Sequence, residues 1–84
     1  MPDVIIFPNP TKEDFKIRLL GMKGECVIQI FDVTGNLIDT LKTDAVITGT
    51  DVPYSLKYKA CAMYLVCVIN THNTITRKVV KWGT

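Results

Sequence analysis

The segment from residue 63 to residue 81 constrains the fold more than any other part of the chain, because it contains two β-like runs around a short polar turn. Every side chain of the first run is apolar. Side chains alternate along a strand, so one face would carry Tyr64, Val66 and Val68, and the other Met63, Leu65, Cys67 and Ile69. A run that is apolar on both faces is typical of the middle of a sheet with cover on both sides.

The second run follows the turn formers Asn70-Thr71-His72-Asn73. It alternates more loosely, with Ile75 and Val79 on one face and Lys78 and Val80 on the other. The run is β-branched and basic, and lysine on an edge discourages pairing with other chains. It is therefore predicted to be an edge strand.

Proline and glycine divide the rest of the chain into short segments. Pro8-Asn9-Pro10 predicts a rigid, extended turn, because each proline fixes its own φ and biases the residue before it. Gly35 in the sequence Asp-Val-Thr-Gly-Asn predicts a hairpin loop with a left-handed glycine. Strands are predicted over residues 4–7, 15–19, 26–31 and 37–43, with a weaker edge strand over 45–52 that Gly49 interrupts.

Two segments are harder to interpret. In the strand predicted over 37–43, Leu37 and Leu41 should lie on one side. Residues 54–61 fit both strand alternation and one face of a helix, and are interpreted as a loop with room for a single helical turn.

This pattern predicts an all-β fold, an immunoglobulin-like antiparallel β-sandwich of six to seven short strands. Breaks recur at short intervals, and no segment shows sustained helical periodicity. A small barrel is the alternative. The sandwich is preferred because residues 26–31 and 63–69 are apolar on both faces, as sheet centres are.

Length and composition fit one small domain. The chain has 84 residues, 48% of them hydrophobic, which is enough for a modest core. No apolar run is long enough for a transmembrane helix, and the start lacks the features of a signal peptide. We expect residues 1–84 to be a single C-terminal domain cut from a longer secreted protein, with Met1 as an added start.

Charge and cysteines give weaker indications. The net charge is +2, yet all eight acidic residues lie at or before Asp51, and five basic residues follow it. This asymmetry indicates either an anionic partner or, as the simpler interpretation, an edge protected by Lys and Arg. The three cysteines match no zinc or redox spacing. Cys26 and Cys67 are expected to be buried thiols.

No constellation of catalytic residues is visible. The single histidine, His72, falls in a predicted turn, without carboxylates at metal-ligand spacing. No phosphate-binding loop or nucleophile elbow occurs. We therefore expect no enzyme activity, no metal, no cofactor and no nucleic-acid partner. Scattered aromatic residues leave open a face that stacks on sugar rings.

Four motifs occur in the order found in one known family. They are Phe7-Pro8-Asn9-Pro10-Thr11, Phe31-Asp32-Val33-Thr34-Gly35, Met63-Tyr64-Leu65-Val66 and Lys78-Val79-Val80-Lys81. Together they make the chain similar to the C-terminal sorting domain of the type IX secretion system (Por secretion system). The chain differs from that family at residues 56–62, which form a longer approach without Pro or Gly, and at Ala62, where a glycine is usual. The turn there must therefore differ.

The resemblance implies a secretion signal. Such a domain directs an attached N-terminal cargo through the periplasm and across the outer membrane of a Gram-negative bacterium to the cell surface. The implied partners are the outer-membrane type IX machinery, a sortase that removes the domain, and anionic lipopolysaccharide as the anchor of the cargo. The implied recognition residues are Pro8, Asn9, Pro10, Gly35, Tyr64, Lys78, Val79, Val80 and Lys81.

Two other hypotheses stay open on the sequence. One is a carbohydrate-binding or spacer β-sandwich module of a secreted surface enzyme, which rests on analogy of fold. The other is a sandwich that dimerises through the edge near residues 75–80.

Overall fold

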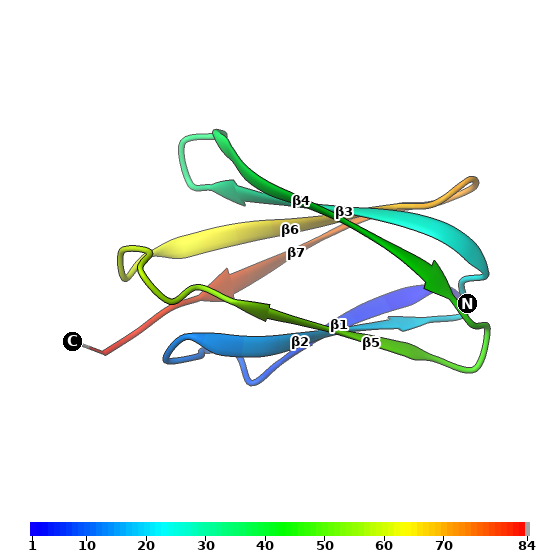
Figure 1. Cartoon of the computed structure of the whole chain (residues 1–84), viewed down its shortest axis with the longest axis horizontal. Coiled ribbons are helices and arrows are strands. Elements are labelled where there is room, and N and C mark those ends of the chain that lie inside the picture. The colour runs from blue at the N-terminus through cyan, green and yellow to red at the C-terminus, as the bar shows by residue number, and fades with distance from the viewer. Residues whose placement is uncertain (84) are drawn as a thin grey trace.

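The computed structural model describes residues 1–83, which form seven strands and no helix. The strands are β1 (Asp3–Phe7), β2 (Asp14–Leu20), β3 (Gly24–Asp32), β4 (Leu37–Ala45), β5 (Thr50–Ser55), β6 (Met63–Ile69) and β7 (Thr74–Val80). Figure 1 shows them as two layers that face each other. The all-β sandwich predicted from the sequence is confirmed.

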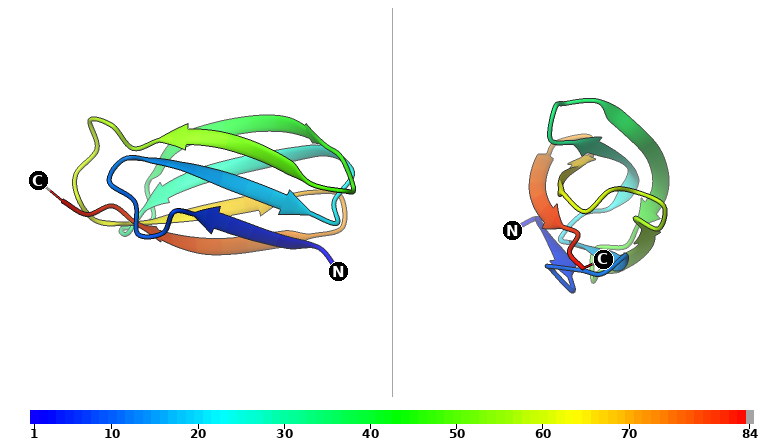
Figure 2. Two further views of the ribbon diagram at one scale, coloured as in Figure 1. Left: turned by 90° about the horizontal axis from the view of Figure 1, so that it is seen from below. Right: turned by 90° about the vertical axis from the view of Figure 1, so that its left-hand side faces the viewer.

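All pairings between the strands are antiparallel. One sheet has the order β1-β2-β5 and the other the order β4-β3-β6-β7. Along one side of the sandwich, the Arg77 guanidinium of β7 donates from Nη2 to the Asp3 carboxylate (2.6 Å) and from Nε to the Val4 carbonyl (3.1 Å). Along the other side, the Tyr54 hydroxyl donates to the Asp39 carboxylate (3.0 Å). These contacts join β1 to β7 and β5 to β4, which are the edge strands of the two sheets. Figure 2 shows the course of these strands.

The core lies between the sheets and follows from alternation. Each strand turns every second side chain inward, and inward positions are apolar on β2, β3 and β6. Residues that are less than 1% exposed include Ile17, Leu19, Cys26, Ile28, Ile30, Leu56, Val66 and Val79. Burial of a core this size is the main force that holds the two sheets together.

The hairpin of β6 and β7 forms as predicted. β6 pairs with β3 on one side and β7 on the other, so it lies inside the sheet, and β7 is its edge. The backbones of Asn70 and Asn73 exchange two hydrogen bonds (2.8 and 3.3 Å), which leaves Thr71 and His72 exposed at the turn.

The prediction that β6 is covered on both faces is wrong. Tyr64, Val66 and Val68 are buried against the other sheet, whereas the opposite face is only half-buried. That outer face includes Leu65 and Cys67, so Cys67 is not the buried thiol expected from the sequence, while Cys26 is. Neighbouring side chains of the same sheet give partial shelter, because β6 is an interior strand.

The expectation for β4 is also corrected. A register shift opposite Ile30 and Phe31 leaves Ile38 without a partner residue, a β-bulge. The extra residue changes the alternation, so Ile38 packs with Leu41 against the core and Leu37 is 51% exposed. Leu37 and Leu41 therefore do not share a side.

The chain between β4 and β6 differs from the prediction in two places. Ala45 still belongs to β4, residues 46–49 form a turn, and β5 begins only at Thr50, as the edge strand expected there. Tyr54 is part of β5, and residues 56–62 form a loop without the helical turn that the sequence allowed. Within residues 1–83, no helix is long and apolar enough to cross a membrane.

Candidate functional site

Most of the residues singled out from the sequence gather at one end of the sandwich. The loop from 8 to 13, the β3–β4 turn, the loop from 56 to 62 and the segment after β7 all lie at the end that is on the left in Figure 1. The N-terminus lies at the opposite end. We call this left-hand end the motif end.

Asn9 binds the free edge of β7. Its Nδ2 donates to the carbonyl of Lys78 (2.7 Å), and its Oδ1 accepts a hydrogen bond from the N–H of Val80 (3.0 Å). These two backbone groups do not pair with β6, and an unpaired strand edge is a ready template for another chain. The primary amide has one donor side and one acceptor side, so it replaces one residue of a neighbouring strand.

Thr11 continues the contact along the same edge. Its N–H donates to the carbonyl of Val80 (2.8 Å), its carbonyl accepts from the N–H of Trp82 (2.9 Å), and it forms a parallel bridge with Lys81. Thr11 is 2% exposed, and its hydroxyl donates to the Asp14 carbonyl (2.5 Å). Thr11 belongs to the first family motif, but its contact with the β7 edge was not apparent from the sequence.

We call the contact of Asn9 and Thr11 with the edge of β7 the clasp. The two prolines flank Asn9 in the chain. The Phe7–Pro8 and Asn9–Pro10 peptide bonds are both cis, and both proline rings are exposed. The structure thus brings the N-terminal and C-terminal motifs together, although about seventy residues separate them.

Lys81 and Tyr64 bind the loop between β5 and β6. The Lys81 ammonium donates to the carbonyls of Leu56 (2.9 Å) and Lys59 (2.6 Å). The Tyr64 hydroxyl donates to the carbonyl of Ala60 (2.5 Å). Tyr64 is 4% exposed, and burial raises the pKa of its hydroxyl above the usual range. Both side chains act inside the fold in this structure.

In the terminal Lys-Val-Val-Lys motif, the side chains along β7 alternate between an exposed and a buried face. Val79 is fully buried, with Tyr64 as its partner residue on β6. Lys78 and Val80 are exposed, and in residues 1–83 no hydrogen bond or ion pair involves the ammonium group of Lys78. Only Lys78 and Val80 therefore present side chains to a partner.

Gly35 has a local role. Its φ of 91° lies in the left-handed region, as the sequence predicted. The carboxylate of Asp32 accepts hydrogen bonds from the backbone and hydroxyl of Thr34 (3.0 and 2.7 Å) and from the backbone of Asn36 (2.9 Å). These bonds hold the pKa of Asp32 below its usual range. Among the hydrogen bonds of residues 1–83, none joins this turn to the Asn9 clasp.

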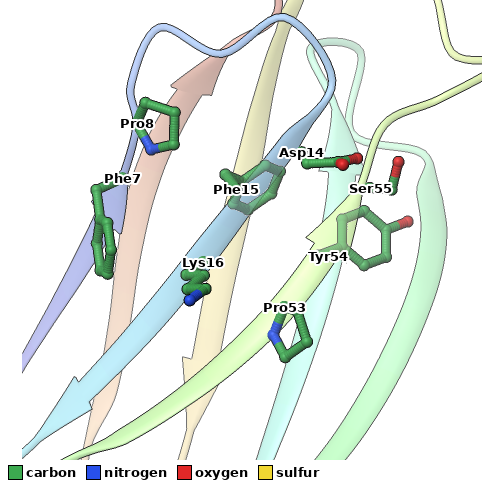
Figure 3. A pocket seen from close by; sticks show the side chains of 8 residues that line it. All are labelled: Phe7, Pro8, Asp14, Phe15, Lys16, Pro53, Tyr54 and Ser55. Atoms are coloured by element: carbon green, nitrogen blue, oxygen red, sulfur yellow. The ribbon is translucent and has the colours of Figure 1, made fainter.

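A shallow groove of about 610 Å³ lies on the three-stranded sheet, next to Pro8. Figure 3 shows Phe7 and Pro8 on one side and Pro53 and Tyr54 on the other, with β2 between them. Its lining is mainly apolar and also includes Asp14, Phe15, Lys16 and Ser55. Burial, and then the hydrogen bond to Asp39, raise the pKa of Tyr54 to about 12. The groove can hold an apolar or ring-shaped group.

The described part of the chain contains no group of three or more His, Cys, Asp or Glu side chains that would hold a metal ion. His72 is exposed in the β6–β7 turn, and this turn lies at the end opposite the motif end (Figure 1).

Comparison with known proteins identifies the family and supports the fold. The model of a family described as "Secretion system C-terminal sorting domain" matches residues 5–82. Among solved structures, the chain is similar to dimeric latent PorU from Porphyromonas gingivalis, with a TM-score of 0.70 and 25% sequence identity over 98% of this chain. The match covers 9% of the PorU chain, so this chain spans less than a tenth of its length. No curated protein matches the sequence.

Proposed function

This chain belongs to the family of secretion system C-terminal sorting domains, and from that premise we propose what it carries and how it is recognised. The domain of this family is the C-terminal sorting signal of the type IX secretion system. The function rests on the family match over residues 5–82. Such a signal leads to export to the surface or the outside of a Bacteroidetes cell.

The cargo joined to this domain precedes residue 1. Residue 1 lies at the end of the sandwich opposite the motif end, so a cargo attached there leaves the motif end free for recognition. After export, a sortase removes the domain and joins the cargo to anionic lipopolysaccharide. The domain itself acts as a binding surface rather than as a catalyst, as sorting domains typically do.

The exporter recognises the motif end through the exposed members of the nine residues named from the sequence. The exposed members are Pro8, Asn9, Pro10, Gly35, Lys78 and Val80. Among them, the side chains of Pro8, Pro10, Lys78 and Val80 are free to contact a partner. Asn9, Tyr64, Val79 and Lys81 hold the surface in shape through the contacts described above, and Gly35 shapes a turn at the same end. The observation that supports this division is the clasp between Asn9 and β7.

The test is export of a periplasmic reporter fused before residue 1, in a host with a working type IX system. We expect the reporter outside the cell, and we expect it in the periplasm when residues 75–84 are deleted. A matched host without the exporter is the control. The proposal is contradicted if the deletion leaves export unchanged, or if the reporter fused to the full domain stays in the periplasm.

The groove beside Phe7 and Tyr54 favours a second candidate, a carbohydrate-binding module. Its aromatic and proline lining suits the apolar face of a sugar ring. A glycan array with the isolated chain tests this function. Binding lost in Tyr54→Ala supports it, and no binding at millimolar sugar removes it.

A further inference from the structure

The loop between β5 and β6 exposes one aromatic side chain almost completely. Tyr58 is 92% exposed, more than any other large hydrophobic side chain apart from Met1. The Lys57 ammonium lies 5.4 Å from the centre of its ring, and Lys59 follows Tyr58 in the sequence. We call residues 57–59 the loop tip. Nothing in the fold explains why a tyrosine should occupy this position.

The backbone at the loop tip is strained. Tyr58 has a φ of 71° and is the single residue other than glycine with a positive φ in residues 1–83. A bulky side chain seldom adopts this conformation. Strain of this kind persists only where the surroundings enforce it, and it gathers at functional sites.

The surroundings that enforce it are visible on both sides of the loop tip. Before the tip, Leu56 is fully buried and its carbonyl accepts from the N–H of Lys59 (2.9 Å). Lys81 and Tyr64 then fix the carbonyls of residues 56, 59 and 60. Two of the motif residues are therefore positioning residues for this loop.

Resting on the sorting function proposed above, we propose that the loop tip is a contact point for a protein of the exporter. The partner surface is an apolar hollow with carboxylates on its rim. A rigid tyrosine offers a large contact area at a small cost in conformational entropy. The two lysines supply positive charge, and no acidic residue follows Asp51 in the sequence.

The chemistry of the loop tip favours a protein over a membrane surface. Electrostatic binding to anionic lipid generally uses clusters of about four to eight basic residues. The tip has two lysines. The hollow that Lys59 lines also contains Lys12, Glu13 and Lys81, but the Lys81 ammonium is already bound to two backbone carbonyls. A single large aromatic side chain on a fixed backbone is instead typical of an interface between proteins.

The first test replaces the ring without disturbing the backbone. Tyr58→Asn removes the ring, and asparagine tolerates the left-handed conformation. We expect export of the reporter fusion to fall at least about fivefold, with a Tm no lower than that of the unchanged chain. Ile47→Asn is the matched control, since Ile47 is 56% exposed in a turn at the opposite end.

The second test reverses charge. The double variant Lys57→Glu and Lys59→Glu should reduce export strongly. The double variant Lys23→Glu and Lys42→Glu changes net charge equally at exposed sites away from the motif end, and should be exported normally. If both pairs reduce export equally, net charge is the cause and the inference is wrong.

The outcomes separate the two proposals. If the unchanged fusion is not exported, the sorting function fails. If it is exported and Tyr58→Asn is exported equally well, only the role of the loop tip fails. Purified chain is also titrated with protein-free vesicles of lipopolysaccharide and phosphatidylethanolamine. Binding there that is lost in Tyr58→Asn assigns the tip to lipid and overturns the inference.

Discussion

The side chain of Asn9 accepts a hydrogen bond from the backbone N–H of Val80, 71 positions further along the chain. The same side chain donates to the carbonyl of Lys78, so one amide occupies the edge of the last strand. A mobile terminal strand is a poor signal, because a partner that binds it must first order it. Asn9 stabilises the ordered form of that strand before any partner arrives.

Asn9→Asp should therefore destabilise the domain. Aspartate keeps the acceptor for Val80 but places a carboxylate oxygen against the Lys78 carbonyl, where a donor is needed. We expect the free energy of unfolding to fall by about 1–2 kcal/mol, measured by urea denaturation. Asn73→Ala is the control and should stay within about 0.5 kcal/mol of the unchanged protein, since no hydrogen bond in residues 1–83 uses that side chain. If both substitutions lowered the free energy of unfolding equally, the contact between Asn9 and β7 would not be the stabilising feature.

The two lysines of the terminal motif should behave differently. Lys81→Met removes two charge-assisted hydrogen bonds to the 56–60 loop, so the free energy of unfolding should fall by about 1.5–3 kcal/mol. Lys78→Met removes an exposed ammonium and should change it by less than about 0.5 kcal/mol. Reporter export should nevertheless decrease in Lys78→Met. A stable Lys81→Met protein with normal export would contradict this division.

Acid should weaken the fold through three carboxylates. The pKa of Asp3 and the pKa of Asp51 are lowered mainly by a hydrogen bond from an arginine. The pKa of Asp32 is lowered mainly by the hydrogen bond from the Thr34 hydroxyl. A carboxylate whose pKa is lower in the folded than in the unfolded state stabilises the fold at pH values above its unfolded pKa of about 3.9. This stabilisation is lost as the pH falls through the pKa of the folded state.

The Tm should accordingly stay level from about pH 7 to 5 and decrease below about pH 4. Asp51→Asn, which removes the ion pair to Arg18 (2.8 Å), should make the acid decrease shallower. Asp44→Asn serves as a control, because residues 1–83 contain no ion pair to Asp44. A decrease that is unchanged in Asp51→Asn would show that this pair contributes nothing.

Alkali should weaken the contact between β4 and β5. The pKa of Tyr54 is raised to about 12 by burial and then by Asp39. Because the pKa of Tyr54 is higher in the folded state, its hydroxyl stabilises the fold at pH values below the unfolded pKa of about 10. This stabilisation is lost as the pH rises toward 12. Tyr54→Phe should make the stability profile flatter in this range. A denaturant series at pH 9, 10 and 11 measures it, with Tyr58→Phe as the exposed control.

The three thiols should react at different rates. Cys61 is exposed, with its Sγ 3.0 Å from the Gly83 carbonyl, and Cys67 is half-buried. Cys26 is fully buried, and its Sγ accepts from Asn70 Nδ2 (3.4 Å). A maleimide reagent followed by mass spectrometry should label Cys61 first and Cys26 only after unfolding. Early labelling of Cys26 would show that the core opens there.

Local patterning was sufficient to predict most of the sandwich. Alternation placed Phe15, Ile17 and Leu19 on the inner face of β2, because side-chain direction on a strand depends only on sequence parity. The turn at Gly35 was likewise predictable, since Asp32 and the glycine determine its conformation within five residues. The motif residues were found by resemblance, and what each of them does was not apparent from the sequence.

The sequence by itself determined most of the strands, the inner face of β2 and the β6–β7 hairpin, because each depends on neighbours along the chain. Tertiary structure alone decided that Asn9 meets Val80, that Lys81 turns inward to hold a loop, and that Ile38 bulges toward the core. Each of these results from contacts between strands that are far apart in sequence or paired in a shifted register. No local pattern encodes the distance between such residues, so only the folded chain shows which motif side chains remain exposed.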